Sequence, residues 1–411
     1  MSARVLMIVL TNYPGDTRVR REAEALVATG AEVDVICPWT PSLGNRRTLA
    51  GVRLCPTGTL EQEGGELSPV AYIVRDVGFV ARAAVQALRL ARRHRYDVVQ
   101  VHTMPDYLVA AATFPKLMGA SVLLDVHDLV PELYAAKFDV GEASPMIRLM
   151  RFVERLCIGF ADHALAVHQP HLDALVGHGN PENKFTVVMN APDPSFFTRR
   201  ADAPSASDPF VLLYHGTISR RHGLENAIRA VQLARKSYDD IRLEIVGDGD
   251  DVDRLLALVE EESLSDVVEI QRGLRPIEDL KPILERAAAG IVPLVDNAFT
   301  RFMLPVKLLE YVAIGIPVIC SSTPTIRAYF DESMVLFFRS GDERDLARKI
   351  VALRRDVALR RQLVESADSF LKQHSWERER DRYCEVIEAL AAARGSRFGK
   401  RRRQLRERTL G

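Results

Sequence analysis

Two charged residues interrupt the apolar stretch LPVKLLEYVAIGIPVI at residues 304–319. Lys307 and Glu310 are three residues apart, so they share one face of a predicted helix that ends at Gly315. A carboxylate can accept both protons of a sugar diol, and an ammonium group binds phosphate. The pair therefore fits a site for a phosphorylated sugar compound. The alternative is a surface ion pair of small energetic value.

Two arginines in YHGTISRRHGLENAIRA, Arg220 and Arg221, follow a predicted strand that ends at Gly216 and precede a predicted helix. Helix amides and guanidinium groups can share one anion at such a position, and solvated loop arginines are the alternative. Another strand ends at Gly247 in EIVGDGDDVDRL, but Val252 stands where a dinucleotide fingerprint needs its third glycine. The acidic residues of that stretch are typical helix-start residues, so we expect no metal site there.

The first half carries a histidine, His127, at the end of the predicted strand in VLLDVHDLVPELY, with Asp128 and Glu132 just after it. A histidine in that position can exchange a proton with a reacting hydroxyl. The alternative is a structural histidine beside an aspartate that caps a helix. The stretch TNYPGDTRVRREAEAL adds three candidates: Gly15 and Asp16 in the first strand-to-helix loop, and Arg18 in the first turn of the helix that follows.

The elements that must position these side chains alternate along the whole chain. Apolar runs typical of buried strands, such as VLMIVL and SVLLDVH, are separated by amphipathic segments with helical spacing. This alternation predicts an α/β fold with doubly wound parallel sheets. The rhythm breaks at residues 191–209, which are rich in Pro, Ser, Ala and Asp and read as a linker. Two such halves place a cleft between them at the carboxyl ends of their strands.

We therefore predict a first domain over residues 1–195 and a second over 196–375. A strong helix pattern at 376–394 either caps the second domain or packs back on the first, and a basic tail covers 395–411. The length of 411 residues suits two domains. Lys plus Arg and Asp plus Glu both number 55, which gives no overall bias towards nucleic acid.

The five cysteines are scattered without a Cys-x-x-Cys pair, which favours reduced thiols and a cytoplasmic location. No apolar run approaches the roughly 20 residues that cross a bilayer, so we expect no integral membrane segment. Peripheral contact with an anionic membrane at its inner face is a separate hypothesis. It rests on SPMIRLMRFVERLCIGF, residues 144–160, with the basic tail as an aid, and an ordinary buried helix is the alternative.

Taken together and in order, these motifs resemble the large family-4 glycosyltransferases. The matching landmarks are DTRVRREAEALVATGAEVDVICP, DVHDLVPELY, KFTVVMNAPDPSFF, YHGTISRRHGLENAIRA, LEIVGDG, LPVKLLEYVAIGIPVI and the late HSW. The resemblance implies the GT-B fold, in which two Rossmann-like domains face a cleft and the second holds most of the nucleotide-sugar. It also implies sugar transfer with retention of anomeric configuration, with no metal or other cofactor.

The resemblance assigns roles to individual residues. Glu310 would bind the nucleotide ribose, Lys307 matches the lysine of the P-x-K-x-x-E subtype, and Arg221 would hold the diphosphate. His127 would lie near the transferring sugar, which makes His127, Arg221 and Glu310 the catalytic candidates. The loop 273–275 would contact the base. The donor-binding candidates as a whole are Gly216, Arg220, Arg221, Gly247, Arg275, Leu304, Pro305, Lys307 and Glu310.

Two positions depart from the commonest family pattern. Phe302 stands where a second glutamate, eight residues before Glu310, is usual, and His222 replaces a frequent lysine before Gly223. The donor sugar therefore does not follow by analogy. The expected partners are a nucleotide-sugar donor and a glycan, lipid-linked or small-molecule acceptor. The alternatives are a non-catalytic subunit of the same fold that binds nucleotide or glycan, and a nucleotide-sugar epimerase.

Overall fold

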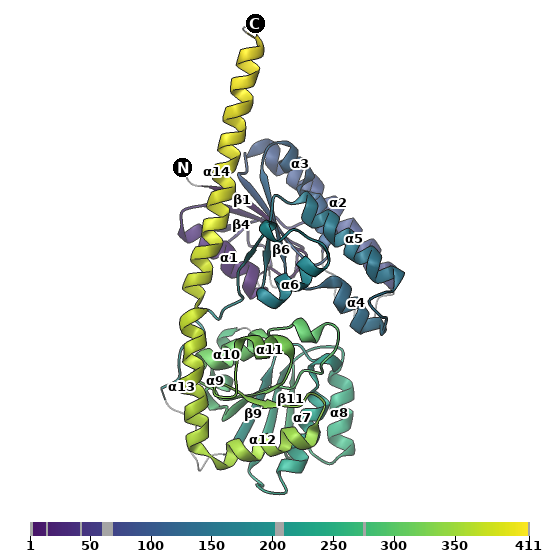
Figure 1. Cartoon of the computed structure of the whole chain (residues 1–411), viewed down its shortest axis with the longest axis vertical. Coiled ribbons are helices and arrows are strands. Elements are labelled where there is room, and N and C mark those ends of the chain that lie inside the picture. Colours follow the sequence, from purple (N-terminus) through teal and green to yellow (C-terminus); the bar gives the residue numbers. More distant parts are fainter. Residues whose placement is uncertain are drawn as a thin grey trace. The chain divides into compact units, whose positions relative to one another are not determined.

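The chain forms two compact units in the computed structural model, which describes residues 3–13, 15–41, 43–59, 69–201, 209–273 and 277–409. The first unit comprises residues 1–189 and 377–411, and the second comprises residues 190–376 (Figure 1). The chain thus leaves the first unit before position 195, where the sequence predicted the boundary.

Part of the predicted linker is packed on the second unit. The backbone N–H of Arg200 donates to Ile314 O over 3.0 Å, and the Arg200 guanidinium donates to Ala287 O over 2.6 Å. Arg199 pairs with Asp368 at 2.5 Å. The rest of that stretch, residues 202–208, lies outside the described residues. The linker prediction, which rested on the Pro- and Ser-rich composition of the stretch, is therefore wrong for residues 191–201.

The first unit is built on an eight-stranded sheet of order β3-β4-β2-β1-β5-β6-β7-β8. Its pairs are parallel except β3–β4, so the sheet is mixed where the sequence predicted a parallel one. The central strands β5 and β6 are buried at every residue, as expected for strands covered on both faces. The strands are β1 (Arg4–Ile8), β2 (Glu32–Ile36), β3 (Thr48–Leu49), β4 (Val52–Leu54), β5 (Val98–His102), β6 (Ser121–Val126), β7 (His163–Ala166) and β8 (Phe185–Val187).

Helices cover this sheet, and one of them is the C-terminal helix of the chain. α14 (Trp376–Thr409) is one continuous helix through both the predicted helix and the predicted tail. Its Leu390 carbonyl accepts from Ser121 Oγ on β6 at 3.0 Å, so this helix packs on the first unit. The other helices are α1 (Thr17–Ala28), α2 (Pro69–Arg93), η1 (Asp106–Ala112), α3 (Thr113–Leu117), α4 (Val130–Phe138), α5 (Pro145–Phe160), α6 (Gln169–Gly177) and η2 (Glu182–Lys184).

The second unit has a six-stranded, all-parallel sheet of order β11-β10-β9-β12-β13-β14. The strand order reverses direction at β9 and β12, the switch point at which such sheets bind ligands beyond their carboxyl ends. The strands are β9 (Phe210–His215), β10 (Ile241–Gly247), β11 (Val268–Arg272), β12 (Ala289–Val292), β13 (Val318–Ser321) and β14 (Leu336–Phe338). The helices are η3 (Arg220–His222), α7 (Leu224–Ala234), α8 (Val252–Glu261), α9 (Ile277–Arg286), η4 (Thr300–Phe302), α10 (Val306–Ile314), α11 (Pro324–Tyr329), α12 (Glu343–Arg355) and α13 (Val357–Gln373).

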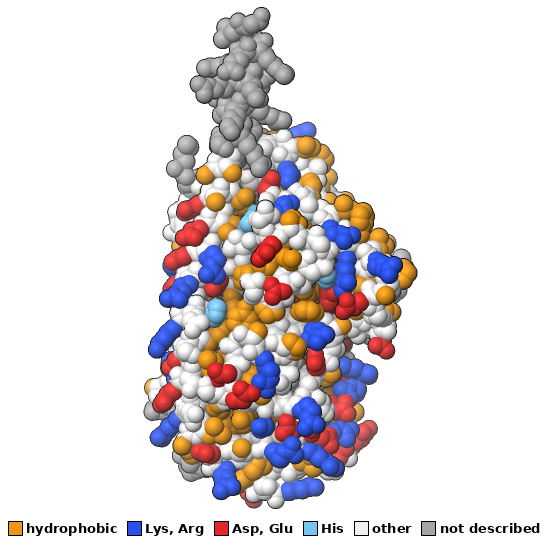
Figure 2. Space-filling model, viewed as in Figure 1, with side chains coloured by type: hydrophobic (Ala, Val, Ile, Leu, Met, Phe, Trp, Pro, Cys, Tyr) orange, Lys and Arg blue, Asp and Glu red, His pale blue; other side chains and the backbone are white. Residues whose placement is uncertain are grey.

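The surface and the cysteines agree with the sequence-based picture. Acidic and basic side chains are interspersed over the face shown in Figure 2. All five cysteines, each among the described residues, are free thiols. Among the described residues, no helix combines the length and the apolar character that a bilayer-spanning segment needs.

Candidate active site

Helix α10 holds Lys307 and Glu310 near its first turn, as the sequence predicted. It begins after Pro305, whose extended backbone serves as the N-cap, and ends at Gly315 with a φ of 85°. Leu308 and Leu309 between the two charged residues are buried, which fixes the apolar side of the helix against the sheet. Lys307 and Glu310 are half-buried on the remaining surface. The apolar residues thus anchor a helix that presents two charged groups.

Glu310 is held by a chain of hydrogen bonds that starts on β9. Its Oε2 lies 2.7 Å from His215 Nε2, and His215 Nδ1 lies 3.0 Å from the Tyr311 hydroxyl. The Tyr311 hydroxyl donates to Leu213 O at 2.9 Å, so it can only accept from His215 Nδ1–H. The short contact between His215 and Glu310 then requires one proton between Nε2 and Oε2. This bond orients the carboxylate and leaves Oε1 as its second acceptor.

Lys307 points at an aromatic ring and not at Glu310. Its Nζ donates to the Tyr214 hydroxyl at 2.9 Å and lies 4.2 Å from the centre of the Tyr214 ring. Burial, together with the nearby Arg221, lowers the pKa of Lys307 to about 7, against an opposing pull from Glu310. The surface ion pair considered as the alternative is therefore wrong, because both side chains, each among the described residues, bind other partners. A bound anion would raise the pKa of this lysine again.

The two arginines of η3 differ sharply in environment. Arg220 has 82% of its side chain exposed and lies 3.8 Å from Asp251. Arg221 has a buried Nε without a hydrogen-bond partner among the described residues, and its guanidinium carbon lies 5.9 Å from the centre of the Phe299 ring. A buried guanidinium nitrogen without a partner is a costly arrangement that a bound anion would relieve. Arg221, more than Arg220, is the anion-binding candidate.

His222, the departure from the usual lysine, carries no positive charge in this environment. Burial, followed by the nearby Lys307 and Arg221, lowers the pKa of His222 to about 2. Its Nδ1 is 3.0 Å from Ser219 Oγ, so the ring is a buried structural group. The positive charge that a lysine at position 222 would supply must therefore come from its neighbours Arg221 and Lys307.

Glycines bring the backbone close to Lys307 at the carboxyl ends of β9 and β10. A Cβ on Gly247 would lie 1.8 Å from Gly216 O, so only glycine lets these two strand ends approach. Gly216 itself has a φ of 106°, and a Cβ there would meet Lys307 Cε at 3.4 Å. Leu304 is half-buried just before the N-cap residue Pro305. The predicted base contact Arg275 lies outside the described residues.

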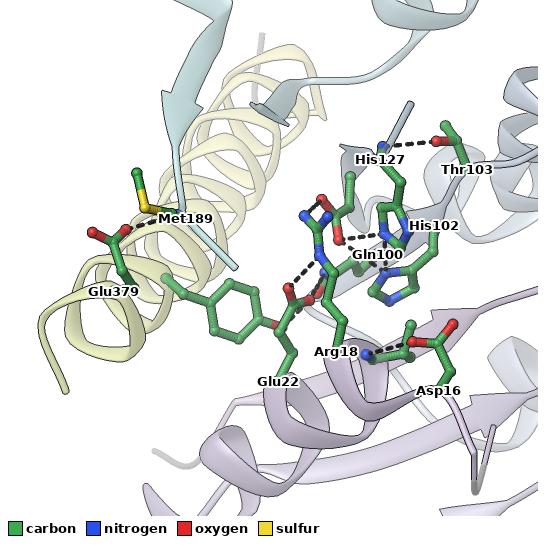
Figure 3. A network of polar contacts seen from close by, with 12 residues as sticks. Asp16, Arg18, Glu22, Gln100, His102, Thr103, His127, Met189 and Glu379 are labelled. Carbon is green, nitrogen blue, oxygen red and sulfur yellow. Dashed lines mark hydrogen bonds and ion pairs between the residues drawn. The ribbon is translucent and has the colours of Figure 1, made fainter. Parts of the chain in front are cut away.

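The first unit holds a buried polar network around Asp125, at the carboxyl ends of β5 and β6 (Figure 3). Asp125 Oδ2 is 3.0 Å from His102 Nδ1 and 2.9 Å from His127 Nε2, and Oδ1 accepts from Arg18 Nη2 at 2.5 Å. Burial alone would raise the pKa of Asp125, but Arg18 and His127 hold it well below its usual range. The His127 backbone N–H also donates to Thr103 Oγ1 at 2.9 Å. His127 is therefore fixed in orientation by its main chain and by Asp125.

The network continues from Arg18 to the C-terminal helix. Arg18 Nε lies 3.4 Å from Glu22 Oε1, and Gln100 Nε2 donates to Glu22 Oε2 at 2.7 Å. The Tyr383 hydroxyl of α14 then donates to Gln100 Oε1 at 2.5 Å. Burial, followed by Asp125, raises the pKa of Glu22. An unbroken series of polar contacts thus joins α14 to His127.

Several first-unit candidates have structural partners of their own. Asp16 caps α1 by accepting from Val19 N at 3.3 Å and from Thr11 Oγ1 at 2.9 Å. Glu132 was predicted to face the acceptor, but it is buried and binds His178 Nε2 at 3.0 Å and Arg151 Nη2 at 2.9 Å. Both of these contacts are made by Oε1, and Oε2 is buried without a hydrogen-bond partner among the described residues.

The other predicted acceptor-side residues lie at different depths. Arg18 lies in the first turn of α1, as predicted, and is buried in the Asp125 network. Gly15 is exposed in the turn before α1, where its N–H donates to Asn12 O at 2.9 Å. Asp128 is half-buried directly after His127.

Sequence reasoning missed the central residues of the network: Glu22, Gln100, His102, Asp125 and Tyr383. A signal existed for three of them. Gln100, His102 and Asp125 stand inside runs of Val and Leu that read as buried strands, and buried polar side chains need partners. Nothing in the local sequence indicated that Tyr383, nearly 300 residues away, supplies one of those partners.

A cation could also occupy the centre of the network. The ligand atoms of His102, Asp125 and His127 lie within 4.8 Å of one another, a spacing that a metal ion tolerates. The same three contacts are explained by hydrogen bonds, and the Arg18 guanidinium already neutralises the carboxylate. We therefore interpret the group as a hydrogen-bonded network that positions His127.

Comparison with known proteins gives one family match for each half of the chain. Residues 15–191 match the family described as "Glycosyl transferase 4-like domain", and residues 195–370 match "Glycosyl transferases group 1". The chain belongs to the family-4-type glycosyltransferases. The putative colanic acid biosynthesis glycosyltransferase WcaL of Escherichia coli K12 is 31% identical to this chain over 142 residues. That match spans 34% of the chain and about a third, 34%, of WcaL.

Solved structures show the GT-B fold for this family-4-type glycosyltransferase. The sucrose-phosphate synthase of Thermosynechococcus elongatus has a TM-score of 0.77 at 19% identity, covering 95% of this chain and 100% of that one. Anabaena HepE in complex with UDP-glucose has a TM-score of 0.70 at 14% identity, covering 94% and 99%. At such low identities the likeness establishes the fold, with two Rossmann-like domains as predicted, the first on a mixed sheet and the second on an all-parallel one.

Proposed function

We propose that the chain transfers a sugar from a nucleotide-sugar donor to a glycan, lipid-linked or small-molecule acceptor, with retention of anomeric configuration. The observation that carries the proposal is the cluster of Arg221, Lys307 and Glu310 beyond the switch point of the second sheet. It combines an unpartnered buried guanidinium nitrogen, a half-buried lysine and an oriented carboxylate. These are the groups that a nucleoside diphosphate requires.

In this proposal the second unit binds the donor. Arg221 and Lys307 neutralise the diphosphate, and Glu310 accepts the ribose hydroxyls through Oε1 while Oε2 stays on His215. As the sugar–phosphate bond breaks, negative charge grows on the leaving diphosphate and the sugar gains oxocarbenium character. Fixed positive groups at that point lower the barrier without reorganisation. The acceptor enters from the face that the diphosphate leaves, and a diphosphate oxygen helps to take its proton.

His127 serves the acceptor side in this proposal. Because its Nε2 is bound to Asp125, Nδ1 is the nitrogen left to meet a sugar hydroxyl. The name of WcaL supports a role in the synthesis of a polysaccharide. The free cysteines favour a reducing compartment, the cytoplasm, for this work.

The first experiment is a thermal-shift panel of UDP-, GDP-, TDP- and ADP-sugars with the full chain. A bound donor raises the unfolding temperature by mass action, so one nucleotide should stand out. The selected donor is then incubated with acceptors, and product is followed by chromatography. Transfer to an acceptor supports the proposal. Binding without turnover favours a non-catalytic subunit, and conversion of the donor without acceptor favours an epimerase.

Donor affinity is expected to fall as the pH rises above 7. Lys307 binds diphosphate as an ammonium group, and its pKa of about 7 in the free protein means that this charge is lost between pH 7 and 9. The dissociation constant should then rise by up to about tenfold per pH unit, the limit for one coupled proton. Isothermal titration calorimetry in buffers of different ionisation enthalpy should report proton uptake on binding above pH 7.

Lys307→Arg is the matched control, because a guanidinium stays protonated throughout this range. Its dissociation constant should vary little over the same pH interval. An identical pH profile for the variant and the parent protein would rule out Lys307 as the titrating group.

Transfer is expected to continue after removal of divalent metal ions. The proposal assigns charge neutralisation to Arg221 and Lys307, so dialysis against EDTA should leave the initial rate within about twofold. Addition of Mg²⁺ or Mn²⁺ should not raise the rate beyond that margin. A large loss that a divalent ion restores would contradict metal-independent transfer and would direct attention to His102, Asp125 and His127.

A further inference from the structure

One flank of the first unit exposes an unusual share of apolar side chains. In the part of the chain that the structure describes, nine of the fourteen exposed large hydrophobic residues lie on α2, α3, α4 and α5. In Figure 2, hydrophobic side chains gather along the edge of the first unit where Figure 1 draws α2, α3 and α5. Large contiguous apolar patches on soluble proteins usually mark a contact surface.

Helix α5 is apolar on two sides. Its Ile147, Cys157 and Ile158 are buried against the unit, while Leu149, Phe152 and Leu156 are 61%, 48% and 57% exposed. The spacing of three and four residues puts these last three on one outward stripe. Arg148 and Arg155 border the stripe and are exposed as well. An ordinary buried helix was the alternative considered from the sequence. The outer stripe is instead exposed and does not pack within the unit.

Helix α2 repeats this arrangement beside it. Val74, Val77 and Val85 form an outward stripe and are 66%, 52% and 46% exposed, opposite the buried Phe79 and Ala83. Both α2 and α5 pack on η1, and α2 also packs on α3. The outward stripes of α2 and α5 therefore belong to one flank.

Helix α3 closes the gap at one end of this flank. Its Lys116 Nζ lies 4.7 Å from the centre of the Phe160 ring, at the last residue of α5, and donates to the Phe160 carbonyl. Phe114 and Leu117 of α3 are 41% and 75% exposed next to it. The outward surfaces of α2, α3 and α5 are thus continuous, and we call them the α2–α3–α5 face.

The charge of this face is one-sided, although the chain as a whole is neutral. α2 carries five arginines and one aspartate, and that aspartate, Asp76, is paired with Arg75. α5 carries three arginines, of which Arg151 is paired with Glu132 and Glu142, and one glutamate, Glu154, which is buried on His178. α3 adds Lys116, which is paired with Asp162 at 3.2 Å, so the exposed arginines of α2 and α5 carry most of the positive charge. Apolar stripes bordered by arginines are the pattern of helices that lie in the surface of an anionic bilayer.

We propose that the α2–α3–α5 face docks on an anionic lipid bilayer, with the apolar stripes inserted between headgroups and the arginines on lipid phosphates. This inference extends the membrane hypothesis from one helix to three and does not depend on the transfer reaction. A protein partner would not require the basic border, and a second copy of this chain would bring two positive faces together.

The test is co-sedimentation of the full chain with vesicles of phosphatidylcholine alone or mixed with phosphatidylglycerol. The protein should bind the anionic vesicles at least about tenfold more tightly at low salt, and added salt should weaken this binding. The variant Leu149→Ser/Phe152→Ser should lose at least about tenfold in partitioning onto anionic vesicles. Val357→Ser, a change at a 41% exposed valine outside the face, should bind as the parent protein does.

Circular dichroism and donor-induced thermal shifts check that each variant is folded, since the donor site lies in the second unit. Absence of binding to anionic vesicles, or equal binding by the double serine variant, would overturn the proposal. So would analytical ultracentrifugation in which the parent chain is dimeric and the double variant monomeric without a change in lipid binding. Failure of the transfer reaction would leave this lipid-binding result unaffected.

Discussion

Arg221→Ala is expected to lower kcat/KM for sugar transfer by about 10²- to 10³-fold. Removal of one fixed donor that stabilises transition-state charge costs roughly 3–4 kcal/mol. Arg221 is the η3 arginine whose buried guanidinium nitrogen has no partner among the described residues, so its charge is available to the leaving diphosphate. Initial rates at varied donor concentration, with the donor identified by thermal shift, measure the effect on kcat and KM separately.

Arg220→Ala provides the matched control from the adjacent position. Its side chain is 82% exposed and its nearest carboxylate is 3.8 Å away. Exposed pairs of this kind contribute little, so the rate should stay within about threefold of the parent value. Equal losses in the two variants would mean that the loop contributes only diffuse positive charge, and the assignment of Arg221 would fail.

Asp125→Asn is expected to destabilise the first unit by about 3 kcal/mol. The change leaves the Arg18 guanidinium buried without its closest carboxylate, and breaking a buried ion pair costs about 3–5 kcal/mol. The lower end applies because Glu22 remains beside Arg18 and can take up part of the charge. Urea unfolding, followed by circular dichroism and by proteolysis at sites in the first unit, measures the loss.

The pH dependence follows from the depressed pKa of Asp125. A carboxyl whose pKa is lower in the folded state stabilises the fold above its unfolded-state pKa of about 4 and loses that contribution as the pH falls. The parent protein and the variant should therefore differ most near pH 7 and converge under acid conditions. A constant difference down to pH 3 would show that packing, and not charge, causes the loss.

A double-mutant cycle with Arg18→Met separates the ion pair from the rest of the network. The variant with both changes lacks the buried charge of each partner, so its loss should be smaller than the sum of the single losses by at least about 1 kcal/mol. Additive losses within about 0.5 kcal/mol would mean that Arg18 and Asp125 do not stabilise each other.

The main strands and the position of Lys307 and Glu310 on one helix followed from local sequence, and the reasons are physical. Runs rich in Val, Ile and Leu favour buried strands, which is why the strands predicted to end at Gly216 and Gly247 are observed as β9 and β10. β3 and β4 were missed because they have two and three residues, too few for a hydrophobic pattern. Lys307 and Glu310 were selected as candidates because charged residues are unusual within an apolar helix.

The partners of these charged residues could not be read locally. Glu310 is oriented by His215, and Lys307 donates to Tyr214, both more than 90 residues earlier on β9. The helical position of Arg18 was predicted, but nothing nearby indicated Asp125 on β6 as its partner. The depressed pKa of Lys307 likewise arises from burial by distant elements and from Arg221. Such properties belong to the tertiary structure.

The bond between Tyr383 and Gln100 has a consequence for synthesis of the chain. The first unit is discontinuous, since residues 190–376 intervene between its sheet and the helix that completes its buried network. Domains normally fold from the N-terminus as they leave the ribosome. Here the hydrogen bond from Tyr383 to Gln100 can form only after the whole second unit and α14 have been made. The inserted unit is continuous and can complete its fold first. The C-terminal helix then completes the buried network of the N-terminal unit.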